Sequence, residues 1–531
     1  MSRNHPFLLQ HFVEMSADKN PGSPFLIQID KLSTYEDIET SANRMARLLR
    51  EIGIKSGDRV AMLVANSPFY VITYYGILKA GGIVVSLNTS ATAELLAHYL
   101  RDSGAAVLVV GSRMESHIGA VLQQAPGTRV VLAERPEQIG TSKRGTDPAD
   151  AQIPSGVRLE HVGTGLAAQS SERPDVPRIS LDLAAIVYTS GSTGLPRGAM
   201  LSHGNLITNT QSIVDYLELS GTDRVLSILP FYYVYGKTLL NTHAAVGGSV
   251  VIENRSIFPN VVLDSLESTE CTGFAGVPST YAILVNRSDL AERTLPHLRY
   301  LTQAGAAMAP ELTRRLMASV SGKQIFVMYG ATEASARLTY LPPSELSRKL
   351  GSIGKAIPNV AVTIQRDDGT EAGVDDVGEI VARGSNIMQG YWNDPESSAR
   401  VLDSHGAYHT GDLGRRDSEG FLYVVGRKTD MLKVGGHRIA AKSIEEAIAE
   451  HHSIHETAVI GVPDEFLGEA VCVFAVLREG HLLGALELSQ FLHDRLPEHA
   501  MPKFIYFRDS LPKNESGKIM KQALREGFTN K

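Results

Sequence analysis

The stretch "DRVAMLVANSPFYVITYYGILKAGGIVVSLN", residues 58–88, contains two apolar runs separated by a helical segment, and it decides the fold class. The first run ends at an Asn-Ser pair, residue types that cap helices, and Pro68 suits a first helical turn. We expect a helix to about Ala80, a stop at the following glycine pair, and a strand over residues 83–87. The stretch therefore predicts a strand, helix and strand in succession.

Similar apolar runs recur along the first half of the chain and predict largely parallel sheets covered by helices on both faces. They lie at residues 105–110, 130–132, 184–188 and 250–252. Residues 135–179 are rich in Gly, Pro, Ser, Asp and Lys without sustained periodicity, so we expect a long surface excursion there between two sheet subdomains. Residues 351–427 carry short strand patterns between turn sequences, which is typical of an antiparallel region.

The chain after Asp430 is predicted to form a small domain of both helices and strands. A chain of 531 residues exceeds what one hydrophobic core supports, so division into domains is expected. The elements that we expect in the small domain are a helix near 442–451, strands at 457–462 and 471–477, a helix near 488–496 and a last helix from Lys518.

Composition excludes several classes of protein. A net charge of −7 gives no basic footprint for nucleic acid. Cys271 and Cys472 show neither metal-ligand spacing nor a disulfide framework, which favours a reducing cytoplasm. The N-terminal residues resemble no signal peptide, and the longest apolar stretch, residues 68–87, contains Lys79 and two glycines. We expect a cytoplasmic protein with no membrane span and no nucleic-acid partner.

The segment "YTSGSTGLPRGAM", residues 188–200, follows a predicted strand and offers many backbone amides and hydroxyls. It matches neither the Walker loop nor the Rossmann fingerprint. Such a loop can cradle an anion, but taken alone it is equally well a surface turn of small residues.

Seven more motifs accompany this loop in a fixed order. They are "GAAMAP" (305–310), "YGATEAS" (329–335), "GSIGKAIP" (351–358), "GEIVARGSNIMQGYW" (378–392), "YHTGDLG" (408–414), "GRKTDMLKVGGHRI" (426–439) and "LPKNESGKI" (511–519). Together the eight motifs resemble the AMP-forming adenylating enzymes, the superfamily of acyl-CoA synthetases, nonribosomal peptide adenylation domains and firefly-type luciferases. The resemblance covers nearly the whole chain.

The resemblance implies an α/β fold and a domain organisation. Residues 1–426 would form a large N-terminal AMP-binding domain of two sheet-and-helix subdomains and a small β-rich subdomain. Residues 427–430 would be a hinge, and residues 431–531 a small mobile α+β C-terminal domain. The implied reaction joins a carboxylate to the α-phosphate of ATP, releases pyrophosphate, and passes the acyl group from acyl-AMP to a thiol. Neutralising phosphate charge calls for hydrogen-bond donors, cations and Mg²⁺.

The resemblance also assigns nucleotide-binding residues in the large domain. Tyr329 would stack on adenine, Thr332 would contact the α-phosphate, and Glu333 would hold Mg²⁺ through oxygen. The other residues implied to bind ATP here are Thr189, Ser190, Gly191, Ser192, Thr193, Gly194, Arg197, Gly305, Ala306, Ala307, Gly330 and Ala331.

Further residues are implied near and beyond the hinge. Asp412 would accept hydrogen bonds from the ribose hydroxyls, and Arg427 would be a second ribose or phosphate contact. Lys518 is the main catalytic candidate with Thr332 and Glu333, because its ammonium could enter the cleft when the small domain closes. The residues expected along the acyl pocket or thiol channel are Tyr233, Gly276, Lys433, Gly435 and Gly436.

The sequence departs from the family pattern at five positions. Arg197 replaces a common Lys, and Arg is a planar donor rather than a point charge. Tyr233 stands where many acyl-CoA synthetases have His, and Thr429 stands at the hinge where Asp or Lys is usual. Ala441 and Ser443 replace Pro and Glu, and we transfer no role to Ser443.

The substrate is predicted to be a small carboxylic acid. The chain has no acidic residue between Leu229 and Val251 to bind an α-ammonium group, whose burial without a partner is costly. An imino or β-amino acid recognised elsewhere stays open. The acceptor is coenzyme A or the phosphopantetheine arm of a separate carrier protein, and we favour coenzyme A as the broader class.

Other functions are disfavoured to different degrees. A non-catalytic nucleotide-binding relative is expected to lack Lys518, Glu333 or Asp412, and all three are present. A Walker-type ATPase would need the lysine of that loop, which is absent. A luciferase-like oxygenase is only weakly disfavoured, since adenylation is shared.

Overall fold

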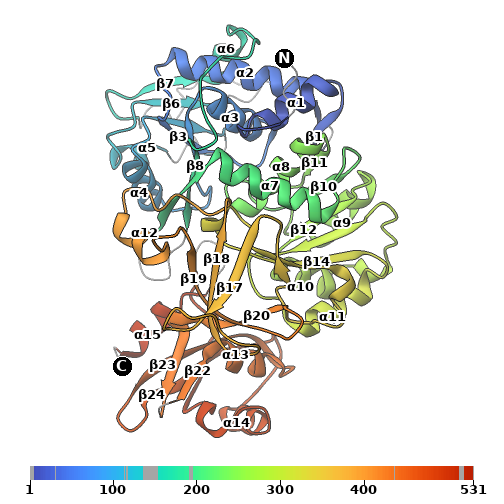
Figure 1. Ribbon diagram of the computed structural model, residues 1–531, viewed down its shortest axis with the longest axis vertical. Coiled ribbons are helices and arrows are strands. Elements are labelled where there is room, and N and C mark those ends of the chain that lie inside the picture. Colours follow the sequence, from blue (N-terminus) through green and yellow to red (C-terminus); the bar gives the residue numbers. More distant parts are fainter. Residues whose placement is uncertain are drawn as a thin grey trace. The chain divides into compact units, whose positions relative to one another are not determined.

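The computed structural model describes residues 5–29, 31–112, 114, 118–134, 153–189, 195–435, 437–513 and 519–529 (Figure 1). These residues belong to two compact units. The first unit comprises residues 1–189, 197–361 and 382–408, and the second comprises residues 190–196, 362–381 and 409–531. The predicted hinge at 427–430 lies within the second unit, and its boundaries stay a prediction.

A seven-stranded sheet forms the first half of the first unit. Its strand order is β7(Arg158–His161), β6(Val130–Ala133), β5(Val107–Val110), β3(Arg59–Leu63), β4(Ile83–Ser86), β8(Leu183–Thr189), β9(Arg197–Ser202). The pairs from β7 to β8 are parallel, and only β8 and β9 run antiparallel. This confirms the expected parallel sheet.

The segment that predicted the fold class forms β3, α3(Pro68–Lys79) and β4. The Ser67 hydroxyl caps α3 by accepting from the Tyr70 amide at 3.2 Å. Helices α4(Ala93–Ser103) and α5(Ile118–Gln123) follow β4 and β5. The helix and both strands therefore lie where the sequence predicts them.

A nine-stranded sheet forms the rest of the first unit. Its order is β16(Lys355–Ala356), β15(Thr339–Leu341), β14(Gln324–Tyr329), β13(Tyr300–Gln303), β12(Gly273–Gly276), β10(Arg224–Ser227), β11(Ser249–Ile252), β1(Pro24–Gln28), β2(Lys31–Thr34). All neighbours from β14 to β1 are parallel, and the strands at both edges are antiparallel. One buried cluster contains side chains from both sheets, such as Val60 and Leu26, so the two sheets share a core.

Helices accompany these sheets as expected. They are α1(His11–Lys19), α2(Tyr35–Glu51), α7(His203–Leu217), α8(Val234–Val246), α9(Pro259–Ser268), α10(Pro278–Arg287), α11(Pro310–Ser319) and α12(Pro395–Val401).

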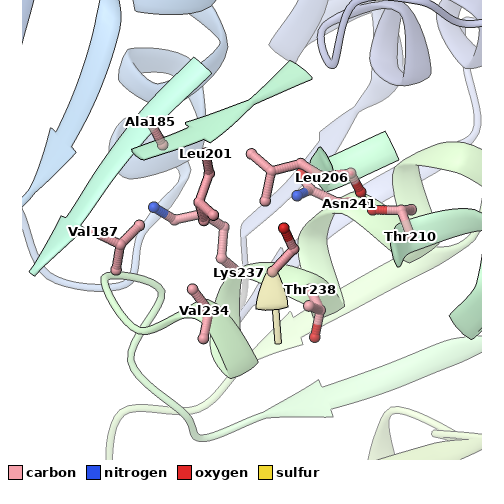
Figure 2. A pocket seen from close by; sticks show the side chains of 10 residues that line it. Ala185, Val187, Leu201, Leu206, Thr210, Val234, Lys237, Thr238 and Asn241 are labelled. Atoms are coloured by element: carbon pink, nitrogen blue, oxygen red, sulfur yellow. Dashed lines mark hydrogen bonds between the residues drawn. The ribbon is translucent and has the colours of Figure 1, made fainter. Parts of the chain in front are cut away.

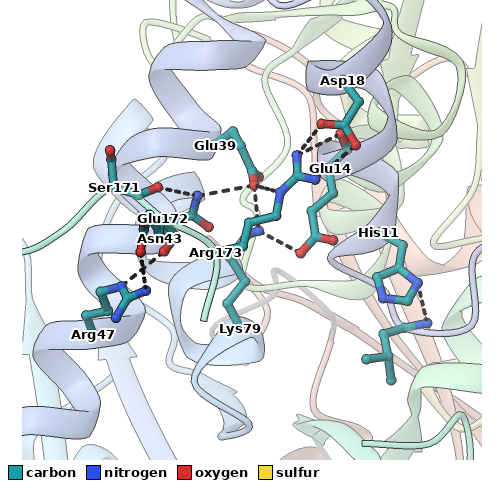
Figure 3. A network of polar contacts seen from close by, with 11 residues as sticks. His11, Glu14, Asp18, Glu39, Asn43, Arg47, Lys79, Ser171, Glu172 and Arg173 are labelled. Atoms are coloured by element: carbon teal, nitrogen blue, oxygen red, sulfur yellow. Dashed lines mark hydrogen bonds and ion pairs between the residues drawn. The ribbon is translucent and has the colours of Figure 1, made fainter. Parts of the chain in front are cut away.

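A buried ion network ties α1, α2 and α3 together (Figure 3). The Lys79 ammonium lies 2.7 Å from a Glu14 oxygen and 2.9 Å from a Glu39 oxygen. Arg173 reaches the same Glu39 oxygen at 2.6 Å and also pairs with Asp18. Because two cations neutralise the buried carboxylate of Glu39, this charged cluster is compatible with burial.

The predicted excursion at residues 135–179 is wrong for part of its length. Residues 135–152 lie outside the described residues, but β7 extends the seven-stranded sheet and α6(Val162–Ala167) contacts α2. Strand β7 is an edge strand with no fully buried residue, so it needs no apolar run. That is why hydrophobic periodicity does not reveal it.

The second unit contains most of a four-stranded sheet and a five-stranded sheet. The first has the order β17(Val360–Gln365), β18(Gly378–Gly384), β19(Tyr408–Arg416), β20(Leu422–Arg427). The short turn η6(Lys428–Asp430) follows. The second sheet has the order β22(His437–Ala440), β21(Met431–Val434), β24(Gly468–Leu477), β23(Ile454–Asp464), with β25(Phe504–Phe507) also on β24. These strands confirm the expected short-strand region and small α+β domain.

Three helices complete the second unit: α13(Ala441–Ala449), α14(Ala485–His493) and α15(Lys521–Thr529). The last helix begins at Lys521, since residues 519 and 520 are not helical, so the predicted start at Lys518 is wrong. Over the ranges given above, no helix combines the length and the apolar character that crossing a membrane requires.

Candidate active site

The glycine-rich loop connects the two strands of a hairpin. Strands β8 and β9 are antiparallel with Thr189 opposite Arg197, and the Thr189 hydroxyl donates to the Arg197 carbonyl at 3.5 Å. Ser190, Gly191, Ser192, Thr193 and Gly194 lie outside the described residues. The hairpin therefore fixes both ends of the segment that the sequence predicts to hold phosphate.

Arg197 lies at the beginning of β9 and contacts two side chains from another segment. Its Nε is 3.5 Å from a carboxylate oxygen of Asp394, and its guanidinium lies 5.6 Å from the centroid of the Tyr391 ring. About a third of its side chain is exposed. The planar guanidinium can thus lie against an aromatic ring while pairing with a carboxylate, which a lysine does less well.

Tyr391 connects Arg197 to the predicted metal ligand. Its hydroxyl donates to Oε1 of Glu333 at 2.8 Å, and its side chain is buried. Burial first, and the Glu333 carboxylate second, raise the pKa of Tyr391 well above its usual range, while Arg197 opposes the rise. The phenol therefore stays protonated and donates to Glu333 at neutral pH.

Backbone hydrogen bonds hold this arrangement in place. The Trp392 amide donates to Gly198 at 2.7 Å, Met200 donates to Gly390 at 2.9 Å, and the Met388 amide donates to the Glu333 carbonyl at 2.8 Å. The segment 388–392 is thus hydrogen-bonded to β9 and to the Glu333 turn together. The β8–β9 hairpin, called the phosphate hairpin below, and the predicted metal ligand Glu333 are therefore both hydrogen-bonded to this one segment.

Glu333 lies on the short turn η4(Thr332–Ala334), just beyond the carboxyl end of β14. The ends of parallel strands are where α/β proteins bind ligands. The turn needs glycine before it, because a Cβ on Gly330 would lie 2.0 Å from the Ala336 carbonyl oxygen. Tyr329, Ala331, Thr332 and Glu333 are all partly exposed, which suits residues that face a ligand.

The donor set around Glu333 suits Mg²⁺ supplied with a nucleotide. No group of three or more His, Cys, Asp or Glu residues in the described ranges could hold a metal by itself. Among the described side chains, only Tyr391 contacts Glu333, at Oε1, and none of them binds Oε2. Magnesium commonly takes one or two carboxylates together with substrate phosphates. A single hard oxygen next to a predicted phosphate loop fits that chemistry.

The residues predicted along the acyl pocket, Tyr233 and Gly276, and the ATP-binding candidates 305–307 lie in the segments that follow or end strands β10, β12 and β13. Tyr233 precedes α8, and its ring centroid is 4.6 Å from that of Tyr232. Gly276 ends β12, where an added Cβ would touch the Tyr281 ring at 3.0 Å. Residues 305–307 follow β13 and are exposed, with Gly305 at φ +92°. All of these residues belong to the first unit.

The second unit brings Asp412 and Arg427 together. They face each other across β19 and β20, with the Arg427 Nε 3.1 Å from an Asp412 oxygen. Most of the Asp412 side chain is buried, whereas nearly half of Arg427 is exposed. The neighbouring Lys428 lies 3.6 Å from Glu379, and Glu379 accepts from the Gly411 amide at 3.0 Å. Asp412 thus lies on a strand, paired with a cation of the neighbouring strand, and the backbone beside it is held by hydrogen bonds.

The remaining predicted residues of the second unit lie on or near β21. Lys433 is exposed, its amide donates to Glu469 at 2.6 Å, and Gly435 adopts φ +56°. Gly436 and Lys518 lie outside the described residues.

Three of the departures from the family pattern also lie in this unit. The Thr429 hydroxyl is 3.5 Å from Asp430, and Ala441 is buried at the start of α13. The Ser443 hydroxyl donates to the Ala440 carbonyl at 2.8 Å, which gives that serine a local structural contact.

Tyr391 and Asp394 were not among the residues predicted from the sequence. Tyr391 lies inside the motif "GEIVARGSNIMQGYW" and Asp394 lies two residues beyond it. The motif itself was the signal, but nothing in the sequence indicates that these two side chains lie beside Arg197 and Glu333.

Comparison with known proteins agrees with this arrangement. Family models described as AMP-binding enzyme and AMP-binding enzyme C-terminal domain match residues 13–392 and 443–518. A long-chain-fatty-acid–CoA ligase of Bacillus subtilis is 32% identical over 532 residues, covering 98% of this chain and 94% of the relative. An indoleacetate–CoA ligase of Aromatoleum aromaticum is 31% identical over 520 residues, covering 98% of each chain.

A solved structure of similar fold holds a nucleotide. It is the o-succinylbenzoate coenzyme A synthetase of Bacillus subtilis in complex with ATP and magnesium ion. It is 26% identical, its TM-score is 0.83, and the match covers 97% of this chain and 98% of that one.

The family match and the CoA ligases that align over nearly the whole chain define an AMP-forming acid–thiol ligase of the acyl-CoA synthetase type. The chain belongs to the AMP-binding enzyme family.

Proposed function

We propose that this protein uses ATP and Mg²⁺ to convert a small carboxylic acid to acyl-AMP and then forms the thioester with coenzyme A. The observation that carries the proposal is the hairpin bearing Arg197, joined through Tyr391 to a Glu333 carboxylate whose second oxygen no described side chain contacts. Relatives over nearly the full chain are CoA ligases, which favours coenzyme A over a carrier protein as the acceptor.

Residues of the first unit would hold the phosphates and the metal. The residues 189–194 would wrap the β- and γ-phosphates, and Arg197 would add positive charge beside them. Thr332 would donate to the α-phosphate, and Glu333 would provide the protein oxygen for Mg²⁺. When bound, the magnesium ion neutralises phosphate charge that develops as pyrophosphate leaves. Tyr329 and residues 305–307 would contact adenine.

Residues of the second unit would contact the sugar and complete the reaction. Asp412 is the proposed acceptor for the ribose hydroxyls, and Arg427 pairs with that carboxylate at 3.1 Å. Lys518 is the proposed catalytic cation for adenylation. Lys433, Gly435 and Gly436 are proposed to line the thiol channel during the second half-reaction.

The acid is proposed to lack an α-ammonium group. Residues 230–250 contain no carboxylate to pair with such a group, while Tyr233 and Gly276 offer an aromatic and a small surface. The relatives named above act on a fatty acid and on an aryl acetate, which are acids of this kind.

The test is exchange of labelled pyrophosphate into ATP across a panel of fatty, aryl, amino and imino acids. Exchange that depends on one acid class, followed by a coenzyme A thioester of the matching mass, is the expected result. Absence of exchange with every acid would count against acid activation. Transfer to a phosphopantetheinylated carrier protein, but not to coenzyme A, would replace the acceptor proposed here.

Lys518→Ala separates the two half-reactions. One charge pair at ~4 Å and an effective dielectric near 20 amounts to about 4 kcal/mol, so loss of Lys518 should slow adenylation roughly a thousandfold. Thioester formation from preformed acyl-AMP should continue. The matched control is Lys513→Ala, because Lys513 is an exposed lysine that pairs with Glu456 at 2.8 Å. Equal loss of both half-reactions in Lys518→Ala would reject the role given to Lys518.

A further inference from the structure

Among the side chains that the structure describes, Tyr391 alone contacts the Glu333 carboxylate, and the proposed chemistry does not use its phenol. We propose that Tyr391 is a positioning residue that binds Oε1 of Glu333 so that Oε2 is directed to the magnesium ion of the bound nucleotide. This inference rests on the proposed function, since it takes Glu333 as the metal ligand. It adds Tyr391, and through it Arg197 and Asp394, to the residues that determine metal affinity.

The geometry assigns donor and acceptor without ambiguity. The Tyr391 hydroxyl lies 2.8 Å from Oε1 of Glu333, and a carboxylate can only accept at that distance. A phenol is ordinarily protonated at neutral pH, so the Tyr391 hydroxyl is the donor of this hydrogen bond. A hydrogen bond to an ionised acceptor is stronger and more directional than a neutral one.

The other side of the Tyr391 ring is also constrained. The Arg197 guanidinium lies 5.6 Å from its centroid, and Asp394 lies 3.5 Å from that guanidinium. Each of these side chains attracts the next. The Asp394 carboxylate pairs with the Arg197 guanidinium, that guanidinium lies beside the Tyr391 ring, and the Tyr391 hydroxyl donates to the Glu333 carboxylate. Arg197 belongs to the phosphate hairpin, and the row therefore connects the cation of that hairpin with the metal ligand.

The segment that carries Tyr391 is held in place by backbone hydrogen bonds, so it does not need the Tyr391 hydroxyl for its position. Tyr391 and Ala199 form a β-bridge, and the amides of Met388 and Trp392 donate to Glu333 and Gly198. These bonds do not involve the phenol and persist in Tyr391→Phe. Removing the hydroxyl should therefore leave the segment in place and release only the Glu333 carboxylate, which can then rotate about its side-chain torsions.

The test measures metal binding without turnover. Mn²⁺ replaces Mg²⁺, and the unbound ion is counted by electron paramagnetic resonance in the presence of α,β-methylene-ATP, which adenylation cannot cleave. The variants are Tyr391→Phe, Glu333→Gln and Tyr35→Phe. Tyr35 is the matched control, because its buried hydroxyl donates to His243 and Gly248 carbonyls at 3.0 and 2.7 Å and makes no contact with Glu333.

Loss of a residue that orients a metal ligand typically weakens metal affinity about 10- to 100-fold, and this is the expected effect of Tyr391→Phe. Tyr35→Phe should bind Mn²⁺ as the unmodified protein does. Unchanged Mn²⁺ affinity in Tyr391→Phe, together with weakened affinity in Glu333→Gln, would overturn the inference and leave the proposed function standing. Equal weakening in both tyrosine variants would also overturn it, because the effect would then be general destabilisation. Unchanged affinity in Glu333→Gln would instead reject Glu333 as the metal ligand.

Discussion

Lys237→Met should make the first unit more stable, although it removes a hydrogen bond. Lys237 lies on α8 with 2% of its surface exposed. It lines a cavity of about 10 Å³ together with apolar side chains such as Val187 and Leu201 and polar ones such as Thr210 and Asn241 (Figure 2). Its ammonium reaches the Ser86 hydroxyl at 3.0 Å and lies 5.3 Å from the Tyr74 ring centroid. No carboxylate pairs with it among the described residues, unlike Lys79. Burial lowers the pKa of Lys237 from 10.5 to about 7.

The magnitude follows from that pKa shift. Because the unfolded chain binds the proton more tightly, between pH 7 and 10.5 it carries more protons than the folded chain, and stability rises with pH. Because the pKa of Lys237 falls from 10.5 to about 7 on folding, the buried amine lowers the free energy of unfolding at pH 7 by about 4 kcal/mol relative to a side chain that does not ionise. Loss of the Ser86 hydrogen bond costs about 1 kcal/mol, so a net gain of about 1–3 kcal/mol is expected for the methionine.

The pH dependence provides the sharper criterion. Between pH 7 and pH 9 the free energy of unfolding of the unmodified protein should rise by about 2 kcal/mol because of Lys237. The difference in stability between Lys237→Met and the unmodified protein should therefore shrink by that amount. Urea unfolding followed by tryptophan fluorescence measures this, because Trp392 is the single tryptophan and lies in the same unit as Lys237. A variant that is less stable at both pH values, or an advantage independent of pH, would refute the reasoning.

The control is the same substitution at the other buried lysine. Lys79→Met leaves Glu14 and Glu39 without their 2.7 and 2.9 Å partner, so it should destabilise the unit by about 3–5 kcal/mol. Opposite signs for one substitution at two buried lysines would isolate the effect of charge pairing from that of burial.

The remaining predictions also concern the first unit. His203 accepts the Leu9 amide at 3.0 Å, and burial lowers its pKa from 6.5 to about 3. Since only the unfolded chain takes up this proton between those values, stability should fall by about 2 kcal/mol from pH 7 to pH 5, and His203→Gln should remove that part of the slope. A slope identical in the variant would contradict this. Gly354 has φ +81°, and a Cβ there would lie 1.8 Å from the Tyr340 carbonyl oxygen, whereas Gly57 has φ +85° and open space. In the same urea assay, Gly57→Ala should cost about 1–2 kcal/mol and Gly354→Ala more than about 3 kcal/mol. Equal losses would show that the close contact relaxes freely.

The sequence predicts those parts of the fold that depend on local patterns. Residues 58–88 form the expected strand, helix and strand because fully buried parallel strands require apolar runs and because Ser67 and Pro68 begin a helix. Strand β7 escapes prediction since an edge strand can be polar on both faces. The last helix begins three residues later than predicted because Ile519 forms a β-bridge with Lys513 instead of entering the helix.

The sequence motifs identify the candidate site residues but not the contacts between them. The sequence places Glu333 and Arg197 in separate motifs, and Asp412 and Arg427 in two others. It does not show that Asp412 and Arg427 form an ion pair, because their register depends on how β19 and β20 align. It also does not reveal that Arg197, which replaces the family's usual lysine, contacts Tyr391 and Asp394.

The burial of Lys237 is likewise not predictable from the sequence. Its neighbours in the sequence include no feature that distinguishes a buried lysine from an exposed one. Only the tertiary structure brings its ammonium within 3.0 Å of the Ser86 hydroxyl on β4. Burial of a charge is a property of the surroundings, which come from distant parts of the chain.

By itself, the sequence determined the order of strands and helices, the family and the identity of the candidate site residues, because short-range patterns and motifs record these directly. The tertiary structure alone decided which side chains meet. Residues 197, 333, 391 and 394 come together because β-bridges and backbone hydrogen bonds join segments that are up to about two hundred residues apart. Such contacts depend on strand register and on packing of the shared core, and neither is encoded in any single motif.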